Sequence, residues 1–204
     1  MNLLSRLTSR TPERADLVEL FPTWANQTSE AAPRNFHGMV EQIYKQNPII
    51  VAASQARMML FSDVQFAVKR VASGEVDTEH PALEHLRRPW PGGTTSELLA
   101  RMEQDASLSG NAYIFRGRQA SHLQRLQPDK VQVMSNGRQV VGYLYYPNGV
   151  DNGPSVALMP DEVAHYTPVP DPSQNFVGMS WVQTVLLDGM TDHKMAKHQA
   201  KFYD

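Results

Sequence analysis

Histidine is the residue type in this chain best suited to proton transfer or metal binding, because it titrates near neutral pH. Two pairs lie close together in the sequence, His80 with His85 and His193 with His198. Each pair is five residues apart, whereas ligands on one helix face are three or four apart. The spacing favours solvated side chains over a metal site. The seven histidines of the chain are His37, His80, His85, His122, His165, His193 and His198.

An acidic cluster and one tryptophan are further candidates for ligand binding. Glu75, Asp77 and Glu79 lie at alternate positions and offer carboxylates to a cation. We favour a solvated linker for this cluster. Trp90 lies between two prolines and is followed by two glycines, an arrangement that suits a ligand loop. An aromatic plug at a turn, or a subunit contact, is the favoured interpretation of Trp90.

Three lysines near the end of the chain, Lys194, Lys197 and Lys201, form one stripe if that segment is helical. The stripe could contact phosphates, although a solvated helix face is favoured. The sequence contains no cysteine, no glycine-rich phosphate loop, no nucleophile elbow and no HExxH motif. We therefore predict no catalytic residue, no metal and no cofactor.

Composition restricts the class of protein but not its function. The chain has 204 residues, 41% of them hydrophobic, and a net charge of -2. These values suit one globular domain with or without a loose arm, and they exclude global disorder. No apolar stretch is long enough to span a membrane. The lack of cysteine fits a reducing compartment, and the lack of a basic excess is unusual for a free-standing nucleic-acid binder.

Two helices are predicted at the start of the folded part, after a polar, proline-containing segment. We expect residues 1–35 to be an arm that is partly disordered or ordered by a partner. Apolar spacing predicts a helix from Phe36 to Tyr44, and Asn47-Pro48 breaks it and starts a second helix. Residues 49–61 are so apolar that we expect this helix to be buried on most sides. Alternation over 64–69 then predicts a strand.

A capped helix and a series of strands are predicted in the middle of the chain. Thr94 and Glu97 form a capping-box pattern, and Gly110 lies where a helix end favours positive φ. Strands are expected at 113–116, 123–127, 131–135, 138–146, 156–159 and 162–166. In a two-residue hairpin at Asn136-Gly137, Val133 would face Val140.

The last element is predicted to be a long amphipathic helix. Ser180 is its N-cap and Gln183 completes a second capping pattern. No glycine or proline stop signal ends this helix before Asp204, so we expect the sequence to be cut there. The predicted fold class is α+β, with helices flanking a small antiparallel β-meander and a long final helix.

Several short motifs occur in an order that resembles the portal proteins of tailed double-stranded-DNA bacteriophages, in particular the long-tailed phages. A helix runs into a Gly-Asn-Ala-Tyr step, and a Leu-x-Pro-x-x-Val step, a Glu-Val-x-His strand and a Gly-x-Ser helix start follow. The matching residues are Gly110, Asn111, Ala112, Tyr113, Leu126, Pro128, Val131, Glu162, Val163, His165, Gly178 and Ser180. The resemblance covers about residues 37–204.

The resemblance implies a structural protein and not an enzyme. Portal proteins form a ring, normally of twelve subunits, at one capsid vertex, and double-stranded DNA passes through it during packaging and ejection. Implied partners are further copies of the chain, the major capsid protein, the terminase and the head-tail connector protein. The implied location is the virion, after assembly in the host cytoplasm, with no membrane. None of the matching residues is assigned to DNA.

Family members continue for about as long again, so residues 36–204 resemble the outer, wing-like part without stem and clip. Two other functions stay open on the sequence alone. One is a stand-alone α+β module that binds another protein through its arm and proline-rich loops. The other is a hydrolase whose site residues are scattered beyond motif recognition.

Overall fold

The computed structural model describes residues 28–31, 36–117, 121–150 and 152–185. Most of the predicted arm lies outside these residues, as do His193, His198, the lysine stripe and the chain beyond Val185. Residues 181–185 are helical. The other helical elements are α3 (Phe36–Met39), the π-helical η2 (Val40–Tyr44), α4 (Pro48–Ser62), the 3-10 turn η3 (Pro81–Leu83), α5 (Glu84–Arg87), α6 (Thr95–Ser109), and the 3-10 turns η4 (Pro128–Lys130) and η5 (Pro160–Glu162). No helix in this part of the chain is long and apolar enough to cross a bilayer.

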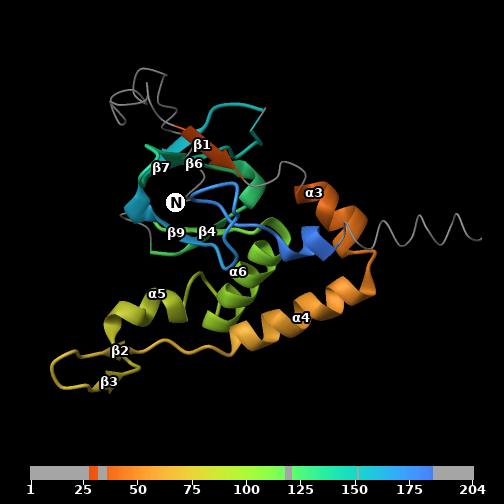
Figure 1. Cartoon of the computed structure of the whole chain (residues 1–204). Helices are drawn as coiled ribbons and strands as arrows, with labels where there is room; N and C mark the ends of the chain where they lie inside the picture. Colours follow the sequence, from red (N-terminus) through yellow and green to blue (C-terminus); the bar gives the residue numbers. More distant parts are fainter. Residues whose placement is uncertain (1–27, 32–35, 118–120, 151, 186–204) are drawn as a thin grey trace, which may run out of the picture.

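The strands form small antiparallel sheets, so the α+β class is confirmed (Figure 1). A four-stranded sheet has the order β1-β6-β7-β8, a three-stranded sheet has the order β5-β4-β9, and β2 pairs with β3. Strands β6, β7 and β8 form the predicted meander, and β5, β4 and β9 form a separate sheet beside it. The strands are β1 (Thr28–Ala31), β2 (Val68–Lys69), β3 (Val76–Asp77), β4 (Ala112–Phe115), β5 (Gln124–Leu126), β6 (Val131–Ser135), β7 (Val140–Tyr145), β8 (Val156–Leu158) and β9 (Val163–Tyr166).

The two larger sheets share one apolar core. Its residues alternate along the strands and come from both sheets, as expected for sheets packed face to face. Helix α6 lies between these sheets and α4 (Figure 1). The buried members of this core are Tyr113, Phe115, Leu126, Val131, Val133, Tyr143, Tyr145, Leu158, Val163 and Val177.

The β6–β7 hairpin has a different register from the predicted one. Val133 lies opposite Tyr143, and Val140 lies opposite Ser135. The reason is a longer loop: Asn136 Oδ1 accepts hydrogen bonds from the backbone N–H groups of Arg138 and Gln139, each at 3.0 Å. This side-chain turn competes with a tight two-residue turn, and the register shifts between Met134 and Ser135.

Helix α4 begins as predicted but is not buried on most sides. Asn47 Oδ1 caps it by accepting from the N–H groups of Ile49 and Ile50. Ile50 is 2% exposed, whereas Ile49 and Leu60 are each 78% exposed and Met59 is 73% exposed. One face of α4 therefore packs against the rest of the fold, and the opposite apolar face is exposed to solvent. The predicted strand over 64–69 is reduced to Val68–Lys69.

Helix α6 carries two buried carboxylates, each paired with an arginine from another element. Glu103 accepts from Arg57 Nε of α4 at 2.7 Å and from Ser107 Oγ at 3.1 Å. Asp105 forms a bidentate pair with Arg125 of β5. The side chains of Glu103 and Asp105 are 3% and 2% exposed. A buried charge costs much free energy unless it is paired, so both pairs fix the position of α6.

We predict that Arg125→Met destabilises the fold by about 3 kcal/mol, because it leaves the Asp105 carboxylate buried without its partner. Arg88→Met is the matched control, since the Arg88–Glu84 pair is exposed and should be worth less than about 1 kcal/mol. Urea unfolding measures both variants. Equal losses for the two variants would contradict the assigned role of the Asp105–Arg125 pair.

Candidate functional site

Most of the predicted signature residues meet at one junction, where α6 ends and the helix at 181–185 begins. Gly110 to Tyr113 lead from α6 into β4, His165 lies in β9 opposite Tyr113, and Gly178 and Ser180 precede the next helix. Pro128 is separate, because it opens η4 after β5. The structure therefore brings these residues together in space, with Pro128 outside the group.

Two glycines allow the backbones to touch at this junction. Gly110 ends α6 with a φ of 83°, and its N–H donates to Ala106 O at 2.8 Å. A Cβ at Gly110 would overlap the Gly178 carbonyl group, and a Cβ at Gly178 would overlap Gly110 O and lie 2.8 Å from Val169 O. Positive φ is strained for any residue with a Cβ. Both positions thus require glycine.

Asn111 satisfies the backbone groups that this contact buries. Its Oδ1 accepts from the Gly178 N–H at 2.8 Å and from His165 Nε2 at 3.0 Å. Its Nδ2 donates to Ser109 O at 3.1 Å and to Gly178 O at 3.2 Å. Asn111 is 0% exposed, so unpaired groups here would be costly. One amide side chain therefore ties the end of α6, β9 and the 178 segment together.

His165 is held as a neutral ring by this network. An amide oxygen only accepts hydrogen bonds, so the His165 ring carries its proton on Nε2. The ring stacks on Tyr113 with centroids 4.3 Å apart and meets Tyr143 edge-on at 5.8 Å. Burial lowers the pKa of His165 to about 4, and burial also raises the pKa of Tyr113. These groups serve as packing and positioning residues near neutral pH.

Ser180 anchors the next helix to α6. Its Oγ donates to Ser107 O at 2.8 Å and accepts from the Gln183 N–H at 3.2 Å, as predicted for an N-cap. Val182 then lies in a second apolar cluster with Phe36, Ile50 and Leu108. The capping pattern at 180–183 therefore sets where the helix starts and which side of it is buried.

The acidic cluster is engaged in local contacts. Glu75 pairs with Arg70 at 3.1 Å, Asp77 Oδ1 accepts from the Glu79 N–H at 2.8 Å, and Glu79 pairs with Arg87. No group of three His, Asp or Glu residues that could hold a metal occurs within the described residues. His80 instead caps η3, where its Nδ1 accepts from the Ala82 N–H at 3.1 Å.

Trp90 packs within its own turn. The Arg101 guanidinium lies 5.0 Å from the centre of the Trp90 ring, and a Cβ at Gly93 would overlap the indole. This arrangement agrees with an aromatic plug at a turn, one of the two interpretations favoured from the sequence.

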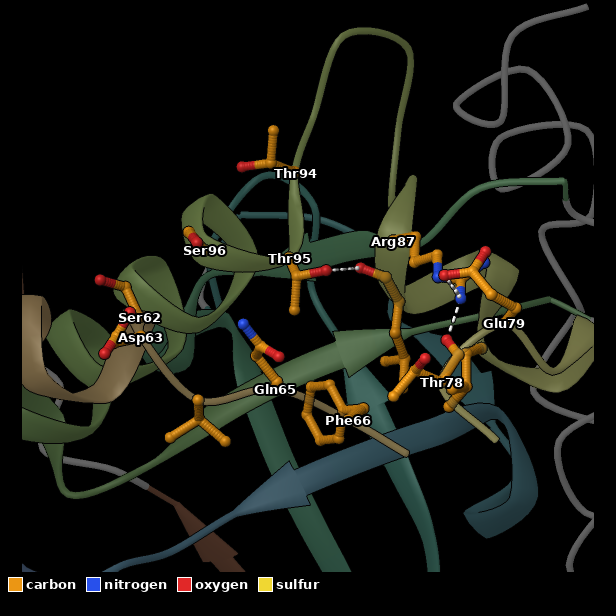
Figure 2. Close-up of a pocket in the computed structure, with 13 residues that line it drawn as sticks. Ser62, Asp63, Gln65, Phe66, Thr78, Glu79, Arg87, Thr94, Thr95 and Ser96 are labelled. Atoms are coloured by element: carbon orange, nitrogen blue, oxygen red, sulfur yellow. Dashed lines mark hydrogen bonds and ion pairs between the residues drawn. The ribbon is translucent and has the colours of Figure 1, made fainter. Parts of the chain in front are cut away.

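A cavity of about 530 Å³ lies away from the junction, between the end of α4, the base of the β2–β3 hairpin, α5 and the start of α6 (Figure 2). Several of its polar groups bond to one another. Arg87 donates to Thr78 O and pairs with Glu79 at 3.0 Å, and Thr95 Oγ1 donates to Leu86 O at 3.0 Å. The lining residues are Ser62, Asp63, Val64, Gln65, Phe66, Thr78, Glu79, Leu83, Leu86, Arg87, Thr94, Thr95 and Ser96. No motif in the sequence marks this cavity.

The family model described as "Phage portal protein" matches residues 48–204. The chain belongs to the phage portal protein family. The match includes the junction at Gly110, Asn111 and Gly178, so the resemblance seen in the short motifs is confirmed at the level of the family. No curated protein matches this sequence significantly.

Solved chains from gene transfer agent particles share this fold. A chain from "Neck of empty GTA particle computed with C6 symmetry" is 23% identical with a TM-score of 0.67, over 85% of this chain and 47% of that one. A chain from "Neck of native GTA particle computed with C12 symmetry" is 21% identical with a TM-score of 0.64, over 90% and 48%. A third, from "Virion of native gene transfer agent (GTA) particle", is 21% identical with a TM-score of 0.65, over 85% and 46%. This chain spans about half the length of each.

Sequence reasoning missed the two buried ion pairs of α6 and the partner of β1. Glu103 and Asp105 are two positions apart and therefore point to different sides of the helix, toward α4 and β5. β1 lies within the predicted arm, yet it pairs with β6. Its Glu30 accepts from the N–H groups of Asn175 and Phe176. No local pattern indicates such long-range partners.

We predict that Gly110→Ala destabilises the fold by at least about 3 kcal/mol, because backbone strain and overlap with Gly178 add. Gly137→Ala is the matched control. Gly137 has a similar φ of 81° but open space around the added Cβ, so only about 1 kcal/mol should be lost. Thermal and urea unfolding measure both variants, and equal losses would refute the close approach at Gly110.

A second prediction concerns pH. His165 in the unfolded chain takes up a proton near pH 6.5, whereas the folded ring stays neutral down to about pH 4. The free energy of unfolding should therefore fall as pH decreases from about 6.5 to 4, by up to about 3 kcal/mol. His165→Gln keeps a donor for Asn111 and should remove this slope. His122→Gln, at an exposed position, should keep it, and identical pH profiles for the two variants would contradict the prediction.

Proposed function

We propose that this chain is part of a portal subunit that forms a ring at one vertex of a virion, and that double-stranded DNA enters and leaves through the ring. The observation that carries the proposal is the family match over residues 48–204. The chains of similar fold come from the neck or virion of a gene transfer agent, and two of those structures were computed with C6 or C12 symmetry. Their symmetry supports a homo-oligomeric ring, and we propose twelve subunits.

The described residues suit the outer, wing-like part of such a subunit. This chain spans about half of its structural relatives, and we propose residues 36–204 as the wing. Residues 1–35, which include the strand β1 at Thr28–Ala31, are proposed as an arm that is partly disordered or ordered by a partner. Further proposed partners are the major capsid protein, the terminase, which would supply the motor, and the head-tail connector.

A structural role without catalysis is consistent with the chemistry of the junction. Asn111 is saturated with hydrogen bonds, the His165 ring is neutral near pH 7, and Ser180 Oγ is bound to the backbone. These polar groups hold segments of backbone and are not free to attack a substrate. The net charge of -2 also fits a passage in which DNA must slide, because many phosphate contacts would hold it.

The test is electron microscopy and mass photometry of the purified protein that carries this chain. We expect rings with a central hole and a mass of twelve subunits. A stand-alone binding module, the alternative, would stay monomeric over the same range of concentrations. Monomers at every concentration would overturn the proposed function, and a ring of another size would correct the subunit number.

A further inference from the structure

Exposed apolar side chains are concentrated in one continuous segment of the chain. In the described part, the large apolar residues with high exposure are Ile49, Met59, Leu60, Val64, Phe66, Val71, Val76 and Val185. All of them except Val185 lie between residues 49 and 76, on α4, on the loop after it and on the β2–β3 hairpin. Single exposed apolar residues are normal, but several that share one face of a helix mark an interaction surface.

Helix α4 is apolar on two opposite faces. The inner face carries Ile50 and Ser54, which are buried, and Phe61, which stacks on Tyr166 with ring centroids 5.3 Å apart. The outer face of α4 consists of Ile49, Ala52, Ala56, Met59 and Leu60, all exposed. These residues recur at intervals of three or four, the spacing of a helix face that packs against another element.

The composition of the outer face of α4 is unsuitable for several kinds of binding partner. It contains no charged residue, because Arg57 points to the opposite side and pairs with Glu103. A DNA phosphate would find no cation there. A membrane-surface helix needs a charged face opposite its apolar one, whereas the inner face of α4 is packed in the protein core. The chemistry fits an apolar protein surface.

Among the described residues, the β2–β3 hairpin has little support beyond its own two strands. It extends away from the rest of the structure (Figure 1), and its ladder contains two residue pairs, Val68 with Asp77 and Lys69 with Val76. An isolated two-stranded hairpin is marginally stable. Val71 at its tip is 99% exposed and Val76 is 59% exposed. A neighbouring surface that covers these valines would stabilise it.

We propose that the outer face of α4 and the β2–β3 hairpin form the contact with a second copy of this chain. A ring with cyclic symmetry needs two different, complementary surfaces on every subunit, and this segment offers an apolar helix face and a projecting apolar hairpin. The inference rests on the proposed ring and on the symmetric particles that contain chains of the same fold. It identifies which surface of this chain closes the ring.

The first test compares two variants that each add one negative charge at an exposed position. Leu60→Glu places it on the outer face of α4, and Gln139→Glu, the control, places it in the exposed β6–β7 loop. Both should keep the circular dichroism spectrum of the unaltered protein. Leu60→Glu should lower the fraction of protein in rings at least tenfold, and Gln139→Glu should leave it unchanged.

The second test uses the absence of cysteine from these 204 residues. Leu60→Cys and Gln139→Cys each introduce a single thiol into these 204 residues, and its labelling with a maleimide can be followed by peptide mass spectrometry. In purified rings, labelling at 60 should be at least tenfold slower than in dissociated chains, and labelling at 139 should be equal in both states. Only copies of this protein are present, so protection at 60 reports a contact between copies.

The outcomes separate this inference from the proposed function. Normal ring formation by Leu60→Glu, or fast labelling of Cys at position 60 in rings, would overturn the α4 contact while the ring itself stands. Failure of the unaltered protein to form rings would overturn the proposed function and this inference with it.

Discussion

The contact between Gly110 and Gly178 is the constraint on which the arrangement of the other elements depends. It brings the end of α6 against the segment before the next helix, closer than a side chain would permit. Such an approach buries backbone N–H and C=O groups, and these must be paired. Asn111 supplies the pairing with one amide group, which bonds both the N–H and the C=O of Gly178.

Helix α6 connects this junction to the rest of the fold. At its end it is held by Gly110 and by the Ser180 hydroxyl bonded to Ser107 O. Along its length it is fixed by ion pairs of Glu103 with α4 and of Asp105 with β5. Because buried charges without partners are costly, a shift of α6 would disturb α4, the sheets and the helix at 181–185 together. The signature residues and the two ion pairs thus hold α6 in one position relative to α4, the sheets and the helix at 181–185.

Local signals in the sequence predicted those parts of the structure that local chemistry determines. The start of a new helix at Asn47-Pro48, the cap at Thr94 and the positive φ of Gly110 follow from neighbouring residues. The order of the strands along the chain did not indicate that they divide between two larger sheets, because the sheet that a strand joins depends on pairing with strands far away in the sequence. The register at Val133 was wrong because Asn136 stabilises a longer loop with its own side chain. For the site, the short motifs named residues that meet in space, but they did not indicate what Asn111 and His165 do there.

The burial predicted for α4 shows that a hydrophobic pattern can be interpreted correctly only when the contacts between subunits are known. Hydrophobic residues around the whole circumference of a helix indicate burial, yet Ile49 and Leu60 are open in the single chain. The pattern indicates that both faces of α4 are apolar, but it does not indicate whether the surface that covers each face belongs to the same chain. Inner-face residues such as Ile50 are covered by the fold itself. If copies of the chain cover the outer face, the sequence prediction fails for the monomer and holds for the ring, with the same physical cause in both cases.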